Sequence, residues 1–73
     1  MKRTATVIEA MEAWWELASR DSKSDRKVND LLEKIAGNKY QDDGDDPIYT
    51  TIRNLTNSER RRFLKGCEAI RNA

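Results

Sequence analysis

Both tryptophans of this chain, Trp14 and Trp15, lie in residues 6–18, which also hold its densest run of apolar residues. At helical spacing the apolar residues share one stripe, and glutamates occupy the opposite face. The stripe consists of Val7, Ala10, Met11, Trp14, Leu17 and Ala18. Thr6 and Glu9 form the capping-box pattern that begins a helix, and a glutamate in the first turn suits the helix dipole. We therefore predict an amphipathic helix here, and we expect the other elements to close over Trp14.

The length of 73 residues fits a single domain, residues 1–73. A core of this size rarely supplies more than ~3–5 kcal/mol of net stability without a disulfide, a metal or a partner chain. The chain has one cysteine and no histidine, so neither an internal disulfide nor a structural zinc site is expected. Self-association, or binding to a larger partner, is the remaining way to stabilise such a core.

The formal net charge is +1, from 14 basic and 13 acidic residues, which argues against a general polyanion binder. The charges are nevertheless segregated, because residues 4–22 and 38–46 are acidic and residues 47–73 are basic. Such zones can pair within the fold, between two copies, or with a partner. No apolar run approaches the ~20 residues that span a bilayer, and no signal-peptide pattern follows the basic start. A cytoplasmic protein without membrane contact is expected, and a free thiol fits that compartment.

Three more segments have helical patterns. The first has an apolar stripe that ends before Gly37, where a left-handed C′ residue belongs. Its stripe consists of Val28, Leu31, Leu32, Ile35 and Ala36. Ser22 and Ser24 are both candidate N-caps. Residues 19–27 contain no glycine or proline, so one continuous helix through this region is also compatible with the sequence.

After a loop at residues 38–46, Asp46 and Pro47 form a cap followed by a first-turn proline. They open a short helix with its inner face at Ile48, Ile52 and Leu55 and with Tyr49 at its edge. Thr56 and Glu59 form a second capping box before the last helix. Its stripe consists of Phe63, Cys67 and Ile70, with Leu64 beside it. No strand pattern competes, so the predicted fold is all-α: a small bundle of three to four short helices around the central N-terminal helix.

Gly66 interrupts the last helix, where a glycine costs ~1 kcal/mol against alanine. It either lets a neighbouring helix approach closely or is simply tolerated. Cys67, on the apolar stripe, is interpreted as a small buried hydrophobic residue and not as a nucleophile, since no base accompanies it.

The acidic loop at residues 42–46 resembles a calcium loop only superficially. With Gly44 at the sixth place, the ligand positions one, three and twelve fall on Lys39, Gln41 and Thr50. A solvated turn that caps the next helix is the favoured interpretation, and an acidic surface for a basic partner is the alternative. With no histidine and no Gly-rich phosphate loop, we expect a non-enzyme that needs no metal and no cofactor.

Positive charge gathers on the last helix, and it makes nucleic-acid contact the second hypothesis. The residues concerned are Arg60, Arg61, Arg62 and Lys65. A DNA-reading helix-turn-helix fits poorly, because Arg53 and Arg60 stand where buried residues are needed. A short arginine-rich helix can bind RNA hairpins, although only one arginine triplet is present here. The alternative is a solvated face that pairs with acidic zones of the same fold, with the stem of Arg60 packed near Phe63.

The tryptophan pair is the most informative candidate site. Neighbouring residues on a helix point about 100° apart, so Trp14 lies mid-stripe while Trp15 lies at its edge with Ile8 and Met11. Both tryptophans could serve the core of a small bundle. Alternatively, Ile8, Met11 and Trp15 extend the apolar surface to a second chain, since tryptophan is enriched at the energetic centres of interfaces.

The first hypothesis is therefore a protein-interaction module that acts as a regulator or inhibitor by binding another protein, and that forms a homodimer. Charged residues would select the partner, namely Glu9, Glu12, Glu16, Asp42, Asp43 and Asp45. In general profile the chain is similar to accessory proteins of phages and other mobile elements, which often bind and block a host protein.

Overall fold

The computed structural model describes residues 4–41 and 44–73. In these two ranges all of the regular structure is helical. The elements are α1 (Val7–Ala18), α2 (Ser22–Ala36), the 3₁₀ turn η1 (Gly37–Lys39), α3 (Pro47–Asn54) and α4 (Asn57–Arg71). The predicted all-α class and the small helical bundle are confirmed.

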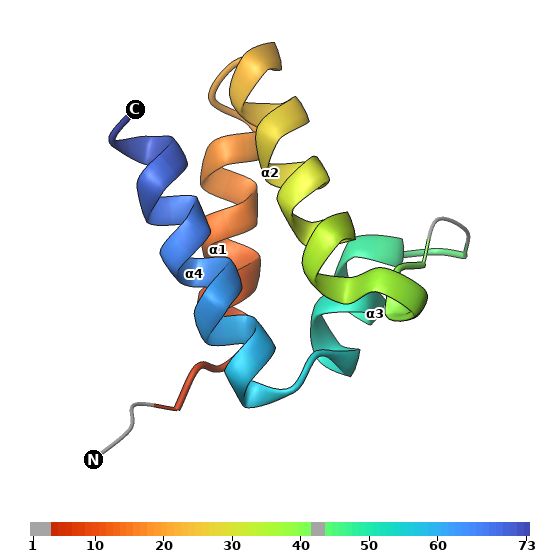
Figure 1. The fold of residues 1–73 in the computed structure, drawn as a ribbon. Coiled ribbons are helices and arrows are strands. Elements are labelled where there is room, and N and C mark those ends of the chain that lie inside the picture. The colour runs from red at the N-terminus through yellow and green to blue at the C-terminus, as the bar shows by residue number, and fades with distance from the viewer. Residues whose placement is uncertain (1–3, 42–43) are drawn as a thin grey trace.

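Three helices, α1, α2 and α4, run lengthwise beside one another, and α3 packs against α1 near one end of the bundle (Figure 1). The core lies where these helices meet. Its fully or nearly fully buried members are Ala10, Ala13, Leu17, Val28, Leu32, Ala36, Ile52, Leu55, Phe63 and Cys67. Because α1 contacts each of the other α-helices, it is the central element that its apolar pattern predicts.

The helix starts follow the local signals in the sequence. The Thr6 hydroxyl accepts a hydrogen bond from Glu9 N at 3.1 Å, and the Thr56 hydroxyl accepts one from Glu59 N at 3.1 Å. In both boxes the glutamate carboxylate accepts from the cap residue's own amide. Asp46 caps α3 through the amide of Tyr49. These contacts satisfy amides that have no partner inside a helix.

The helix is interrupted between α1 and α2. The alternative of one continuous helix through residues 19–27, which the sequence left open, is therefore not what forms. The N-cap of α2 is Asp21, so the expectation of Ser22 or Ser24 at that place is wrong. Asp21 is extended, and its carboxylate accepts from Ser24 N at 2.7 Å. A carboxylate at a helix N-terminus also interacts favourably with the helix dipole, which a serine hydroxyl cannot do as strongly. At the other end Gly37 has the positive φ, 55°, of the predicted left-handed residue, but its ψ of -120° lies outside the left-handed helical region.

The most deeply buried residues of α1 match the predicted stripe only in part, because four of its members, Val7, Met11, Trp14 and Ala18, pack against the core while partly exposed. Ala10, Ala13 and Leu17 are the buried residues of this helix, and Trp14 is only partly buried. The expectation that the bundle closes over Trp14 is therefore corrected. Alanines allow the other helices to approach α1 closely, whereas a large indole with a polar N–H suits the edge of the α1–α2 contact. There Trp14 Nε1 donates to Asn29 Oδ1 at 3.1 Å.

Candidate functional site

An apolar surface remains open to solvent on the side of α1 that faces away from the core. Ile8 is 71% exposed and Trp15 is 66% exposed, and Met11, which is partly buried against the core, lies between them at helical spacing. Ile8, Met11 and Trp15 are called the α1 outer patch here. Met11, Glu12 and Trp15 line a shallow hollow in it. The structure thus brings together the three residues that were predicted as a protein interface.

The exposed indole of Trp15 lies beside an anchored neighbour. The rings of Trp14 and Trp15 have centroids 6.4 Å apart and are tilted by 44°. Trp14 is fixed by Asn29, whose amide nitrogen donates to the backbone and side-chain oxygens of Asp25, each at 2.8 Å. This chain of contacts limits the motion of Trp14, so the surface against which Trp15 lies is preorganised for binding.

The acidic residues predicted to select a partner have different surroundings. Glu16 forms a two-point ion pair with Arg71, at 2.8 and 3.2 Å, and Glu9 closes the cap of α1. Glu12 is exposed and borders the α1 outer patch, and Asp45 is exposed in the loop. The other two, Asp42 and Asp43, lie outside the described residues. Glu12 is therefore the predicted acidic residue that adjoins the apolar surface.

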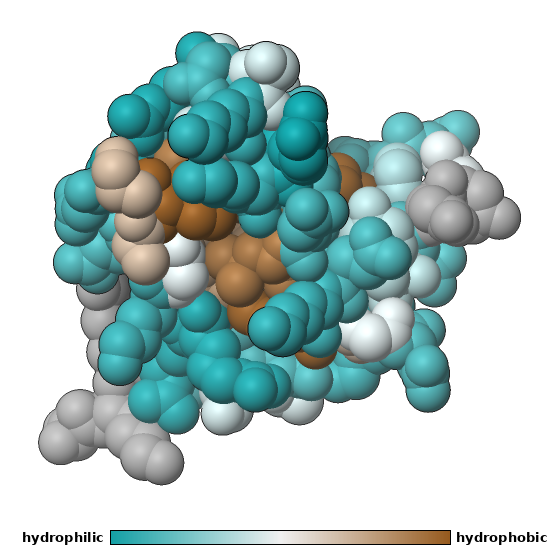
Figure 2. Space-filling model, turned by 45° about the horizontal axis from the view of Figure 1, so that its top comes forward, coloured by the Kyte–Doolittle hydropathy of each residue, from teal (hydrophilic) through white to brown (hydrophobic). Residues whose placement is uncertain are grey.

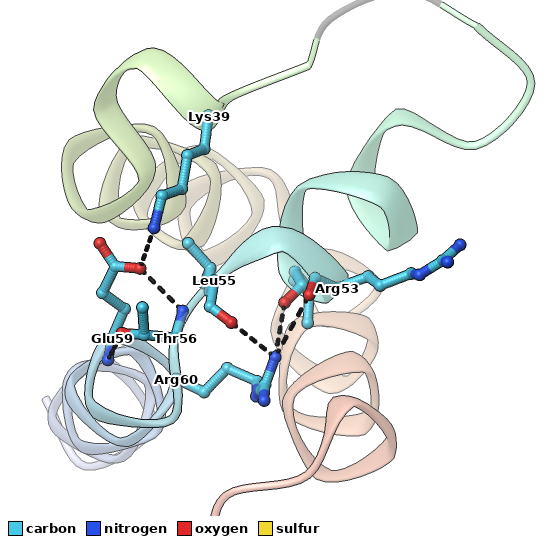
Figure 3. A network of polar contacts seen from close by, with 7 residues as sticks. Lys39, Arg53, Leu55, Thr56, Glu59 and Arg60 are labelled. Carbon is cyan, nitrogen blue, oxygen red and sulfur yellow. Dashed lines mark hydrogen bonds and ion pairs between the residues drawn. The ribbon is translucent and has the colours of Figure 1, made fainter.

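The positive charges of α4 do not form one outward surface. Arg60 turns into the bundle, where its guanidinium donates to the carbonyl oxygens of Leu55 at 2.7 Å and Ile52 at 3.2 Å, and to that of Arg53 at 3.5 Å (Figure 3). Its Nε donates to the carbonyl oxygen of Ala5 at 2.8 Å. The last carbonyls of α3 lack helical partners, and a cation there is also favoured by the helix dipole.

Arg60 is therefore a structural residue that caps α3 and ties down the segment before α1, a role that sequence reasoning missed. The available signal was its place on the inner side of the last helix, near Phe63. That signal predicted packing of the stem but not the target of the guanidinium. Of the other predicted contacts, Arg62 and Lys65 are exposed, and Arg61 is partly buried. The Nε of Arg61 makes no hydrogen bond to a described residue.

Two titratable groups have shifted pKa values, and neither adjoins the α1 outer patch. The hydrogen bond from Lys39, at 2.7 Å, together with those from Thr56, lowers the pKa of Glu59 to about 2. Burial raises the pKa of the Cys67 thiol to about 12, so this sulfur is not activated as a nucleophile. Among residues 4–41 and 44–73, no group of three or more acidic or cysteine side chains is arranged to hold a metal ion.

No helix in the described part of the chain combines the length and the apolarity that crossing a bilayer requires. Comparison of the sequence with protein-family models, with curated proteins and with solved structures finds no match. The function is therefore inferred from the surfaces of the chain itself.

Proposed function

We propose that this protein is a non-enzymatic interaction module that regulates or inhibits another protein by binding it through the α1 outer patch. The observation that carries the proposal is the exposure of Trp15, at 66%, beside Ile8, at 71%. A tryptophan can bury up to ~250 Å², so this exposure leaves roughly 150 Å² of Trp15 to be covered. At ~25 cal/mol per Å² that area corresponds to about 4 kcal/mol before entropic costs.

These residues lie together, which favours a binding surface over the alternative of single apolar side chains that are merely tolerated in solvent. Scattered exposed hydrophobic residues need no explanation, whereas a contiguous group indicates an interaction surface. Ile8 and Trp15 are two helical turns apart with Met11 between them, and Trp15 lies against the anchored ring of Trp14. A binding surface that contains an aromatic ring already held in place, here that of Trp14, loses less entropy in the complex.

Self-association through the same patch is the simplest use of this surface. In a two-fold pair of antiparallel α1 helices, Ile8 of one copy would meet Trp15 of the other, with Met11 near the axis. A patch of three residues is smaller than the ~800 Å² per partner of a standard stable interface. A homodimer of this kind is therefore weak, and a partner protein that covers the patch displaces the second copy.

The homodimer is tested by sedimentation equilibrium of the wild type, Trp15→Ala and Tyr49→Ala over a concentration series. Tyr49 is a matched control because it is 42% exposed on a different helix. The expected result is a mass that rises with concentration for the wild type and Tyr49→Ala, and a monomer for Trp15→Ala. A wild type that stays monomeric up to about 100 μM, equivalent to about −5.5 kcal/mol of association free energy, rules the homodimer out.

Binding to another protein is tested with a photo-crosslinking side chain at position 8, in cells of the native host. The expected adduct forms in the wild-type and Tyr49→Ala backgrounds and is lost with Trp15→Ala. An adduct of equal yield in all three backgrounds would place the contact elsewhere. Purified partner and protein then give the affinity, and the partner's own activity shows whether binding inhibits it.

Nucleic-acid binding by α4 is the second candidate, supported by the exposure of Arg62 and Lys65. The engagement of Arg60 with main-chain carbonyls reduces the charge available for phosphates. The discriminating measurement is the affinity for a duplex and an RNA hairpin as a function of salt, because phosphate contacts weaken steeply as salt rises. Arg61→Glu with Arg62→Glu should abolish such binding, whereas Trp15→Ala should not affect it.

A further inference from the structure

A second apolar surface lies where α2 and α4 run side by side. Gly66 has no side chain, so Leu31 rests against the α4 backbone there. Ile35 follows Leu31 by one turn and Ile70 follows Gly66 by one turn, so both lie along the same contact. Leu31, Ile35 and Ile70 are all partly buried. The floor of this surface, which is called the α2–α4 groove here, consists of Leu31, Ile35, Gly66 and Ile70. Apolar atoms occupy the middle of this face, ringed by hydrophilic ones (Figure 2).

The rim of this groove is mostly basic. Its exposed cations are Lys23, Lys27, Lys34 and Arg62. Lys23 and Lys27 line a hollow at one end of the groove together with Ile70. Lys27 and Lys34 flank Leu31 at helical spacing, and Arg62 lies one turn before Gly66. None of these four cations forms an ion pair with another described residue.

Fewer acidic groups than basic groups lie near this rim, and two of the acidic groups already have partners within the chain. Asp21 caps α2 and lies 3.9 Å from Arg20, while Glu59 is held by Lys39 at 2.7 Å. Asp30 is exposed on α2. The groove therefore presents unpaired positive charge around an apolar floor. Its charge is opposite to that of the glutamate beside the α1 outer patch, so the two surfaces suit partners of different chemistry.

The difference in exposure between the floor and the rim narrows the class of partner. The apolar residues of the floor are partly buried between exposed basic side chains, so a flat bilayer surface would meet the rim before it met the floor. Phosphates of a nucleic acid would use the rim and leave the apolar floor without a contact. A helix can insert one ridge of side chains between two others. Acidic residues on either side of such a ridge would reach the rim.

We propose that the α2–α4 groove binds an acidic amphipathic helix of a partner protein. The apolar ridge of that helix covers Leu31, Ile35 and Ile70, and its carboxylates pair with the lysines and Arg62 of the rim. This is helix-in-groove recognition with charges that set orientation and partner choice. The groove does not share residues with the α1 outer patch, so this proposal stands or falls independently of the proposed function.

The probe is a labelled synthetic helical peptide with leucines along one face and glutamates on both flanks. A matched peptide carries lysine in place of every glutamate. Fluorescence anisotropy gives the affinity, and amide chemical shifts of the isotopically labelled protein locate the site. The glutamate peptide is expected to shift amides of α2 and α4 along the groove, and to bind at least about tenfold more tightly than the lysine peptide. Acrylamide quenching of the tryptophan fluorescence is expected not to change, because both tryptophans lie on α1.

The variant that tests the rim is Lys27→Glu with Lys34→Glu. Its control is Arg26→Glu with Arg53→Glu, which changes the net charge equally at exposed residues outside the groove. Arg26 lies three residues before Asn29, on the α1 side of α2, and the side chain of Arg53 extends away from the bundle (Figure 3). All four positions are exposed, so thermal melts by circular dichroism should match the wild type.

The groove variant should bind the glutamate peptide at least about tenfold more weakly, while the control keeps the wild-type affinity. An equal loss in both variants would show a nonspecific charge effect and overturn the proposal. So would shifts confined to α1, or no binding by the wild type at millimolar peptide. A hairpin RNA or an anionic vesicle that gives the same shifts at higher affinity than the peptide would also overturn it.

Discussion

Gly66 of α4 lies directly against the Leu31 side chain of α2, so closely that a side chain at position 66 would force Leu31 to shift. A Cβ atom built on Gly66 would lie 2.6 Å from Leu31 Cδ2 and 2.9 Å from Leu31 Cδ1. Carbon atoms in contact stay about 3.5–4.0 Å apart. The glycine therefore allows the close approach of the two helices, which is one of the two interpretations that the sequence left open.

Gly66→Ala tests this packing, because the substitution has two opposing effects on the free energy of unfolding. Alanine gains ~1 kcal/mol of helix propensity over glycine, while overpacking costs typically 1–3 kcal/mol. We expect a net loss of about 1 kcal/mol in the free energy of unfolding, measured with urea. In a Leu31→Ala background the same change should be neutral or stabilising, which gives a coupling of at least ~1 kcal/mol. Equal effects in the two backgrounds would contradict the contact.

Arg60 should be important for stability, although it lies in the basic run of α4. Arg60→Ala leaves the carbonyl oxygens of Leu55 and Ala5 without this donor, and we expect a loss of ~2–3 kcal/mol in unfolding free energy. Arg60→Lys keeps the charge but not the several directed donors, so its loss should be intermediate. Arg62→Ala, at an exposed position, should stay within about 0.5 kcal/mol of the wild type. A similar loss of unfolding free energy in Arg60→Ala and Arg62→Ala would contradict the structural role of Arg60.

Local signals made most of the helix boundaries predictable from the sequence. The capping boxes at Thr6 and Thr56, and the pair Asp46 and Pro47, involve residues within three positions of one another, so their chemistry is visible before folding. At the start of α2, the carboxylate of Asp21 and the hydroxyls of Ser22 and Ser24 lie within four residues, and the carboxylate forms the cap. Boundary predictions are reliable where one cap stands alone and less so where several candidates adjoin.

Contacts between distant parts of the chain were not predictable in the same way. Burial along α1 depends on how the other helices pack against it, and there the small Ala13 is buried while Trp14 is only partly buried. The use of Arg60 depends on where α3 ends in space, which no spacing within α4 reveals. The exposed group of Ile8, Met11 and Trp15 was predictable because it follows from the period of a single helix.

The ion pair of Glu59 and Lys39 should make stability fall in acid. Because hydrogen bonds from Lys39 and Thr56 lower the pKa of Glu59 from 4.5 to about 2, the folded state favours the ionised carboxylate. This contribution is complete above the unfolded value of 4.5, and it is lost as the pH falls through the folded value of about 2. Melting temperatures from pH 7 to pH 2 should therefore fall less steeply in Glu59→Gln than in Glu12→Gln. Parallel curves for the two variants would mean that the pair does not contribute.

Cys67 offers a direct measure of how often the core opens. Its sulfur is fully buried, and burial raises the pKa of the thiol to about 12. A thiol reagent at pH 8 therefore reacts only after the chain opens. With a net stability of ~3–5 kcal/mol, labelling should be slowed on the order of 10²–10⁴ relative to the unfolded chain.

The labelling rate should follow the other variants and the pH in a defined way. Gly66→Ala should raise the rate about tenfold for each 1.4 kcal/mol of unfolding free energy that it loses, whereas the exposed change Arg62→Ala should not raise it. Because the folded pKa lies above the unfolded value of 9.0, the unfolded thiol ionises first as the pH rises. Stability should therefore decline above about pH 9 in the wild type and less in Cys67→Ala. Labelling as fast as that of a free thiol, with the helical circular dichroism signal retained, would show that α4 opens without global unfolding and that Cys67 is not held in the core.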